Sequence, residues 1–247
     1  MFPLRDENPT QNTPIATFIL IGLNVLAWVF LQGLGNDPKL SESICYFGLI
    51  PADLLGAGMN GLDQQVCPTS GDGSWLNILT SMFMHGGWMH IIGNLWFLWI
   101  FGDNVEDAMG SLRFFIFYAL SGLGAALAQM FSDPSSSIPM VGASGAIGGV
   151  MGAYALLYPK AHVHMLIFLG FYITTLAVPA IFMLGYWLLI QLVSGYMAPD
   201  GQGGVAFWAH VGGFVAGLLL AFLFRQPERL QRHLAAEPRR TAKHRLF

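Results

Sequence analysis

Six long apolar runs constrain this chain more than any other feature of its sequence. They contain no Asp, Glu or Lys, and their one Arg, Arg113, lies at the end of its run. The runs cover residues 15–34, 84–101, 112–131, 144–158, 173–193 and 205–224. A spanning helix needs about 20 mostly apolar residues, and backbone groups that face lipid must be paired within the helix. The runs also lack the alternating polarity of a membrane β-barrel. The sequence predicts an all-α membrane protein, a six-transmembrane-helix bundle with a short fourth helix and a long first outer loop.

The composition agrees with a membrane protein and excludes several other classes. Only 10% of the 247 residues are charged and 54% are hydrophobic, whereas soluble domains carry about 25% charged residues. This excludes a disordered chain and an ordinary soluble domain. The net charge of -3 offers no basic groove for phosphates, so we expect no nucleic-acid partner.

The positions of the basic residues predict how the chain is oriented. With six crossings, Lys39 is the one basic residue of 11 that falls on the side opposite the termini. The positive-inside rule then places both termini in the cytoplasm. We expect a cytoplasmic segment 1–14, a six-helix domain 15–224 and a basic cytoplasmic tail 225–247. The first run has no cleavage site of small residues, so we expect a retained helix and not a signal peptide. The lack of a targeting extension favours the inner (plasma) membrane of a bacterium.

The first outer loop, residues 35–79, holds both cysteines, Cys45 and Cys67. An oxidising outer compartment would favour a disulfide between them, with a stabilisation of about 3 kcal/mol. Two free thiols are the alternative.

The fourth run is too short to cross the bilayer alone. Its 15 residues, Ser144 to Tyr158, span about 22 Å as a helix. Loop residues precede it, and irregular backbone at membrane depth must be buried in protein or line a water-filled cavity. We therefore expect Ser144 to begin a helix beside such a cavity. Gly145 and Gly149 are spaced for close helix packing. A tightly packed helix with a capping serine is the alternative interpretation.

The sixth run carries a histidine close to its outer end. His210 shares a helical face with Gly213 and Gly217, which would let this helix pack closely against the fourth run. Ser144 and His210 then lie at the same depth. Histidine can take the serine proton during attack and return it to the leaving amine. No acid lies within the runs, so we expect a dyad and not a triad. A purely structural histidine is the alternative.

The second run contains His90 and Asn94, four residues apart on one helical face. Both side chains can donate hydrogen bonds to a developing oxyanion, together with the backbone N–H of Ser144. A polar clasp between helices is the alternative. A zinc site would need His-Glu-x-x-His, and no histidine here precedes Glu, so we expect no metal.

Taken together, these residues resemble the rhomboid family of intramembrane serine proteases. The resemblance rests on Gly142-Ala143-Ser144-Gly145, on Ala209-His210 with Gly213 and Gly217, on His90 with Asn94, and on the six-helix pattern. It covers residues 14–224.

The resemblance implies a role for each matching residue. Ser144 would be the nucleophile, His210 the general base, and His90, Asn94 and the Ser144 N–H the oxyanion donors. His85 matches a family histidine near the water-filled entrance, and Glu106 matches a structural acid. One departure is Gly148, which stands where some bacterial members carry a tyrosine against the histidine, so another side chain must orient His210.

We therefore predict a rhomboid-like serine endopeptidase that acts through an acyl-enzyme and needs no cofactor. Its partners would be transmembrane protein substrates and the lipid bilayer, with the active site open to the outer side and no oligomeric state indicated. Substrates would carry helix-weakening residues near the cut, and the resemblance adds a small residue before the cut and entry beside the fifth helix. Pro179 would weaken that helix locally. The rivals are a non-catalytic binding protein of the same fold and a small transporter; a transporter should show inverted repeats, which are not evident.

Overall fold

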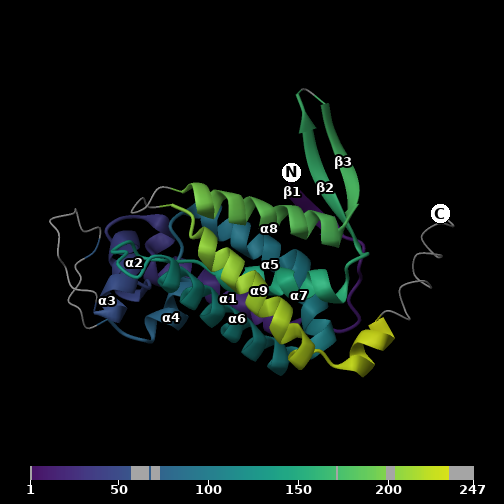
Figure 1. Cartoon of the computed structure of the whole chain (residues 1–247), viewed down its shortest axis with the longest axis horizontal. Coiled ribbons are helices and arrows are strands. Elements are labelled where there is room, and N and C mark those ends of the chain that lie inside the picture. The colour runs from purple at the N-terminus through teal and green to yellow at the C-terminus, as the bar shows by residue number, and fades with distance from the viewer. Residues whose placement is uncertain (1, 57–66, 68–72, 171, 199–203, 234–247) are drawn as a thin grey trace.

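The computed structural model describes residues 2–56, 67, 73–170, 172–198 and 204–233, most of them helical (Figure 1). Six helices form the body of the molecule. They are α1 (Ile15–Leu26, continued as a π-helix over Ala27–Leu31), α5 (Trp88–Met109), α6 (Ser111–Ser132), α7 (Ser144–Leu157), α8 (Ala180–Met197) and α9 (Phe207–Phe224). Short helices α2 (Lys39–Phe47), α3 (Pro51–Leu55) and α4 (Asn77–Thr80) lie between α1 and α5, with 3-10 turns at Gly33–Gly35 and Ser81–Phe83.

Helix α7 forms the centre of the fold. Twelve of its 14 residues are buried. Helices α5, α6, α8 and α9 each pack against it (Figure 1). Helix α9 lies against both α6 and α7. A core helix surrounded in this way can be short and rich in glycine, because its neighbours and not its own side chains shield it from lipid.

Backbone-to-backbone packing joins α7 to α9. A Cβ on Gly213 would overlap the carbonyl oxygen of Gly145, and one on Gly217 would overlap Gly149. These four glycines therefore let two helix backbones touch, as small residues do in membrane bundles. The contact places the first turns of α7 and α9 side by side.

Within the described part of the chain, three helices are long and apolar enough to cross a membrane: Ser111–Ser132, Ala180–Met197 and Phe207–Phe224. The apolar segments Ile15–Leu31 and Ser144–Leu157 are shorter. The boundaries of the second run differ from the prediction, since α5 begins at Trp88 and continues to Met109. The six crossings remain a prediction.

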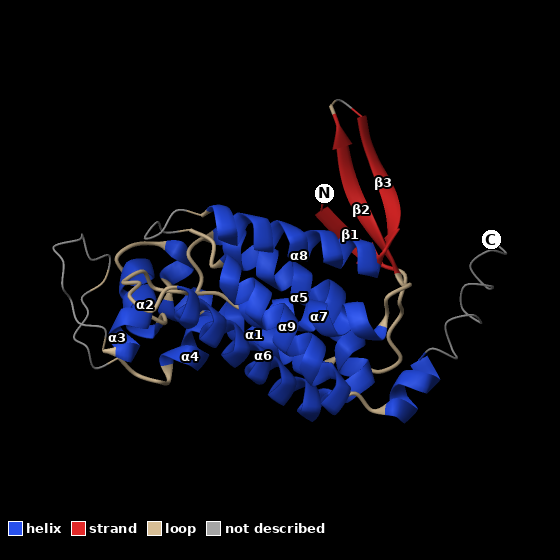
Figure 2. Cartoon of the chain, viewed as in Figure 1, coloured by secondary structure: helices blue, strands red, loops and turns tan. Residues whose placement is uncertain are grey.

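A three-stranded antiparallel sheet corrects the prediction of an all-α protein. Its strands are β1 (Phe2–Asp6), β2 (His162–Leu169) and β3 (Tyr172–Pro179), in the order β1-β2-β3. Phe2 pairs with Leu166, and His162 pairs with Pro179. The β2–β3 hairpin projects away from the helices (Figure 2). β1 is tied to the bundle through Trp96, whose Nε1 donates to the Pro3 carbonyl over 2.6 Å.

The sheet also corrects the prediction that the whole fifth run, residues 173–193, is helical. Its first seven residues, Ile173 to Pro179, belong to β3, and the helix starts only at Ala180. β-branched residues such as Thr174 and Thr175 favour the strand, and pairing with β2 satisfies their backbone groups. Pro179 has ψ 136 and precedes the helix. It therefore delimits α8, and the prediction that it weakens the helix from within is wrong.

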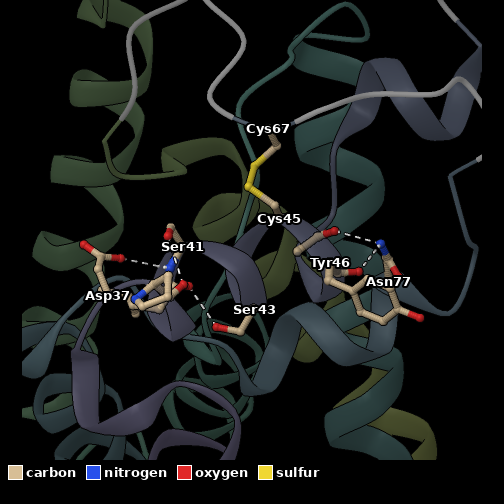
Figure 3. The surroundings of a disulfide bond; sticks show 10 residues. Asp37, Ser41, Ser43, Cys45, Tyr46, Cys67 and Asn77 are labelled. Carbon is tan, nitrogen blue, oxygen red and sulfur yellow. Dashed lines mark hydrogen bonds between the residues drawn. A yellow bond between two sulfur atoms is a disulfide. The ribbon is translucent and has the colours of Figure 1, made fainter.

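The segment between α1 and α5 is held by a disulfide and several hydrogen bonds. Cys45 in α2 is bonded to Cys67, with the two Cα atoms 5.3 Å apart (Figure 3). Asn77 Nδ2 donates to the carbonyl oxygens of Tyr46 and Gly48 over 3.3 and 3.0 Å. These bonds link α2 to α4 and so fix the chain that enters α5. Residues 57–66 and 68–72 of the predicted loop lie outside the described residues.

The start of the predicted basic tail packs on the bundle. Residues 227–233 are helical, and His233 is buried between Asp107, at 3.1 Å, and Asn8, at 2.6 Å. The predicted tail residues 234–247 lie outside the described part of the chain.

Glu106 joins the end of α5 to the start of α1. Its two carboxylate oxygens accept hydrogen bonds from the backbone N–H groups of Ala16 and Thr17 over 2.9 and 2.8 Å. The Thr17 and Ser111 hydroxyls also donate to this carboxylate, over 2.8 and 2.6 Å. The first N–H groups of a helix have no partner inside it, so this carboxylate caps α1 from a distant segment.

We expect Glu106→Ala to destabilise the protein by about 2–4 kcal/mol, because buried N–H groups of α1 lose their acceptor. The measurement is thermal unfolding of the purified protein in detergent. Glu42→Ala, which removes an exposed acid from α2, is the matched control and should leave the melting temperature almost unchanged. Equal melting temperatures for the two variants would show that the Glu106 bonds do not hold α1.

Candidate active site

The first residue of α7 and the first turns of α9 meet at one point. Ser144 is the first residue of α7, and His210 is the fourth residue of α9. The Nε2 atom of His210 is 2.8 Å from the Ser144 Oγ. The glycine contact between the two helices accounts for this proximity, because Gly145 and Gly213 are each within one turn of the two side chains.

This pair lies in a cavity of about 810 Å³. Residues from α5, α6, α7, α8 and α9 line it, together with the segment that precedes α7. The lining includes His90, Asn94, Ser144, Trp187 and His210. A cavity of this volume has room for several residues of an extended peptide, and it gives access to a serine inside an otherwise apolar bundle.

Two polar side chains of α5 converge on the chain segment just before Ser144. Gly142 has φ 123, a conformation that favours glycine. A Cβ at this position would lie 2.6 Å from His90 Nε2 and 3.5 Å from Asn94 Nδ2. The absence of a side chain at Gly142 therefore leaves room for both nitrogens close to this backbone, two residues before the serine.

The hydrogen bonds of His90 define which nitrogen carries its proton. The backbone N–H of Gly86 donates to His90 Nδ1 over 3.2 Å. A neutral imidazole accepts at one nitrogen and donates at the other. His90 therefore presents an Nε2–H to the space beside Gly142.

Asn94 supplies a second donor in the same place. Its side chain is only 7% exposed, and its Nδ2 has no hydrogen-bond partner among the described residues. A buried amide that lacks a partner costs free energy unless a ligand or water satisfies it. The Nδ2 of Asn94 is therefore free to donate to an acceptor that enters the cavity.

His85 differs from its expected position near the cavity entrance. It precedes α5, it is fully buried, and it is not among the residues that line the cavity. Its ring lies 5.1 Å from that of His90. The Nε2 of Gln32 donates to the His85 carbonyl over 2.7 Å, and the backbone N–H of His85 donates to Gln32 Oε1 over 2.8 Å. His85 is therefore buried beside His90 and outside the lining of the cavity, and its predicted role near the entrance stays a prediction.

Sequence reasoning missed the side chain that contacts Nδ1 of His210. Gln191 of α8 is buried, and its Oε1 is 2.7 Å from His210 Nδ1. Gly148 lies against the His210 carbonyl, where a Cβ would be 3.0 Å from the oxygen, so a larger residue there would require a small shift between the two helices. The available signal was a glutamine within an apolar run, since polar residues in membrane segments are usually functional.

Among the residues that the structure describes, no group of three or more His, Cys, Asp or Glu side chains could hold a metal ion. The arrangement that is present consists of a hydroxyl, an imidazole and two converging N–H donors. These are the groups that acyl transfer through a serine requires.

Comparison with known proteins identifies the family. The Rhomboid domain model matches residues 72–227, which is more than half of the chain. The chain therefore belongs to the rhomboid family, as its motifs predicted, and its apolar helices agree with an integral membrane protein.

Individual relatives come from bacteria, yeast and plants. Rhomboid protease GluP of Bacillus subtilis (strain 168) is 29% identical over 215 residues, which are 87% of this chain and 36% of GluP. Rhomboid protein 1, mitochondrial, of Saccharomyces cerevisiae is 25% identical over 94% of this chain and 70% of its own length. RHOMBOID-like protein 4 of Arabidopsis thaliana is 32% identical over 81% of this chain and 50% of its own length. This chain thus spans about a third of GluP and half of the plant protein.

Proposed function

We propose that this protein is an intramembrane serine protease that hydrolyses peptide bonds in or beside transmembrane segments of other proteins. The observation that carries the proposal is the 2.8 Å contact between Ser144 Oγ and His210 Nε2 inside a cavity of the helical bundle. Membership of the rhomboid family and similarity to the Bacillus subtilis rhomboid protease support it.

The reaction would proceed in two halves. His210 Nε2 accepts the hydroxyl proton while Ser144 Oγ attacks the carbonyl carbon of the scissile peptide. The tetrahedral intermediate collapses, His210 gives the proton to the leaving amine, and an acyl-enzyme remains. Water then attacks the ester, its proton passes to His210 and on to Ser144 Oγ, and the acid product leaves. Side chains and water are sufficient for each step.

The negative charge of the tetrahedral intermediate would develop beside Gly142. His90 Nε2 and Asn94 Nδ2 lie next to Gly142, and N–H groups in the first turn of a helix have no partner within that helix. Fixed donors of this kind stabilise an oxyanion without reorganisation during the reaction. The orphaned state of Asn94 Nδ2 fits a donor that is satisfied only when substrate reacts.

We expect Asn94→Ala to lower kcat by about 100- to 1000-fold with a smaller change in KM, because the lost bond is strongest in the transition state. The measurement is steady-state cleavage of a single-span substrate in detergent. Asn36→Ala is the control, since Asn36 is exposed and lies outside the cavity. A change confined to KM would assign Asn94 to ground-state binding.

Substrate geometry follows from the backbone. A helical substrate keeps its carbonyls inside its own hydrogen-bond ladder, so the cut segment must be extended. We therefore expect helix-weakening residues near the outer membrane face and, from the family resemblance, a small residue before the cut. Helix α8 has only four buried residues among 18, which agrees with lateral entry of a substrate beside it. The outer-facing site and cytoplasmic termini belong to the same proposal.

Active-site labelling tests the proposal directly. A fluorophosphonate probe should modify Ser144, with fluoride as the leaving group, and peptide mass spectrometry would locate the adduct. The His210→Ala variant, folded but without its base, should label far more slowly. A folded wild-type protein that neither labels at Ser144 nor cleaves any single-span substrate would favour the non-catalytic binding protein instead.

A further inference from the structure

The imidazole of His210 is held at both of its nitrogens. Nε2 contacts Ser144 Oγ at 2.8 Å, and Nδ1 contacts the Oε1 of Gln191 at 2.7 Å. Trp187, one turn before Gln191 on α8, has its ring 5.7 Å from the imidazole at an interplanar angle of 34°. Two residues of α8, spaced four apart on one face, therefore contact the proposed general base.

The chemistry of the Gln191 contact selects one form of the imidazole. An amide oxygen can only accept a hydrogen bond, so Nδ1 must carry the proton when it faces Oε1. In the neutral ring the lone pair then lies on Nε2, directed at the serine hydroxyl. This is the one neutral tautomer in which His210 can take the proton from Ser144.

The position of Gln191 in the chain argues against a packing role alone. It is 7% exposed, and its neighbours Ile190 and Leu192 are exposed apolar residues on a helix of membrane-spanning composition. A buried amide in such a helix costs free energy unless it is hydrogen-bonded. An apolar side chain of the same size would fill the space without that cost, and it would leave Nδ1 without an acceptor.

We propose that Gln191 is a positioning residue that fixes the tautomer and orientation of His210, in the place that an acid takes in a serine–histidine–acid triad. This inference rests on the proposed function of the Ser144–His210 pair. It also means that the general base, carried by α9, depends on a neighbouring helix, α8.

Two substitutions at one position separate the hydrogen bond from packing. Gln191→Met keeps the length of the side chain and removes the acceptor, whereas Gln191→Glu keeps an oxygen facing Nδ1 in either protonation state. Ile190→Ala, on the exposed side of the same helix, is the control.

We expect Gln191→Met to lower kcat by about 10- to 100-fold, the range for a lost bond to a charged group, with KM within about twofold. Gln191→Glu should restore most of kcat, and Ile190→Ala should match wild type.

A spectroscopic measurement reads the tautomer without relying on activity. Histidine labelled with ¹⁵N distinguishes the protonated from the bare ring nitrogen, and the His210→Ala variant identifies the His210 signals. We expect an Nδ1–H tautomer in the wild type and in Ile190→Ala, and a mixture or the Nε2–H tautomer in Gln191→Met.

The possible outcomes test the positioning role of Gln191 and the protease proposal separately. A Gln191→Met protein with wild-type kcat, or with lowered kcat but an unchanged His210 tautomer, would overturn the positioning role and leave the protease proposal standing. A wild type that shows the Nδ1–H tautomer, lost in Gln191→Met, but that neither labels nor cleaves would overturn the protease proposal while supporting the Gln191 contact.

Discussion

Ser144→Ala is expected to lower kcat for a single-span substrate by roughly 10⁴- to 10⁶-fold, the loss seen when a serine nucleophile is removed from a working catalytic unit. Ser144 Oγ is the hydroxyl that His210 Nε2 contacts in the cavity. Without it, the oxyanion donors still bind a carbonyl, but no acyl-enzyme can form. The measurement is gel-resolved cleavage under single-turnover conditions, with product followed over hours.

The double variant Ser144→Ala with His210→Ala sharpens this prediction. When two groups act as one catalytic unit, the effects of removing them do not add. The double variant should therefore cleave no more slowly than either single variant. Ser121→Ala is the matched control, because Ser121 is also a buried helical serine and its hydroxyl has no partner among the described residues. Substantial cleavage by Ser144→Ala would point to a different nucleophile or a contaminating protease.

Gly213→Ala is expected to reduce both stability and activity strongly. A Cβ at Gly213 would overlap the Gly145 carbonyl, so α9 must move away from α7. Overpacking of this kind typically costs about 1–3 kcal/mol. His210 lies one turn from Gly213 and would move with the helix. A displacement of about 1 Å in a catalytic group can cost about 100-fold in rate, and we expect at least that loss.

The control for Gly213→Ala is a glycine with room around it. A Cβ at Gly22 of α1 meets no atom within 4 Å, so Gly22→Ala should stabilise the helix slightly, by up to about 1 kcal/mol. Melting temperature in detergent, cleavage rate and Ser144 labelling would be measured on both variants. If Gly213→Ala labels and cleaves like Gly22→Ala, the backbone contact does not set the distance between Ser144 and His210.

The helical part of the fold was predictable because the bilayer limits the options. Apolar runs of sufficient length leave little choice but helices, and the spacing of Gly145, Gly149, Gly213 and Gly217 indicates which helices approach closely. Ser144 and His210 were predicted to meet because each begins a glycine-rich segment from the same side, and the structure places them within hydrogen-bond distance.

What the sequence did not reveal depends on contacts between distant segments. Residues 173–179 of the strand continue into the helix as one run without charged residues, so the run itself does not mark where the strand ends; pairing with β2 does. Gln191 was hidden in the same run because no spacing rule links it to His210, 19 residues away. The burial of His85 could not be predicted, because a resemblance gives a position in the chain and not the depth of a side chain.

The Gln191–His210 bond also bears on how such an enzyme can be inhibited. The contact joins α8, which is largely exposed, to His210, the proposed general base. A membrane-soluble compound that wedges between α8 and α9 would remove the acceptor at Nδ1 without reaching the serine. We therefore expect inhibitors that carry no electrophile, enter from the lipid side and leave Ser144 unmodified.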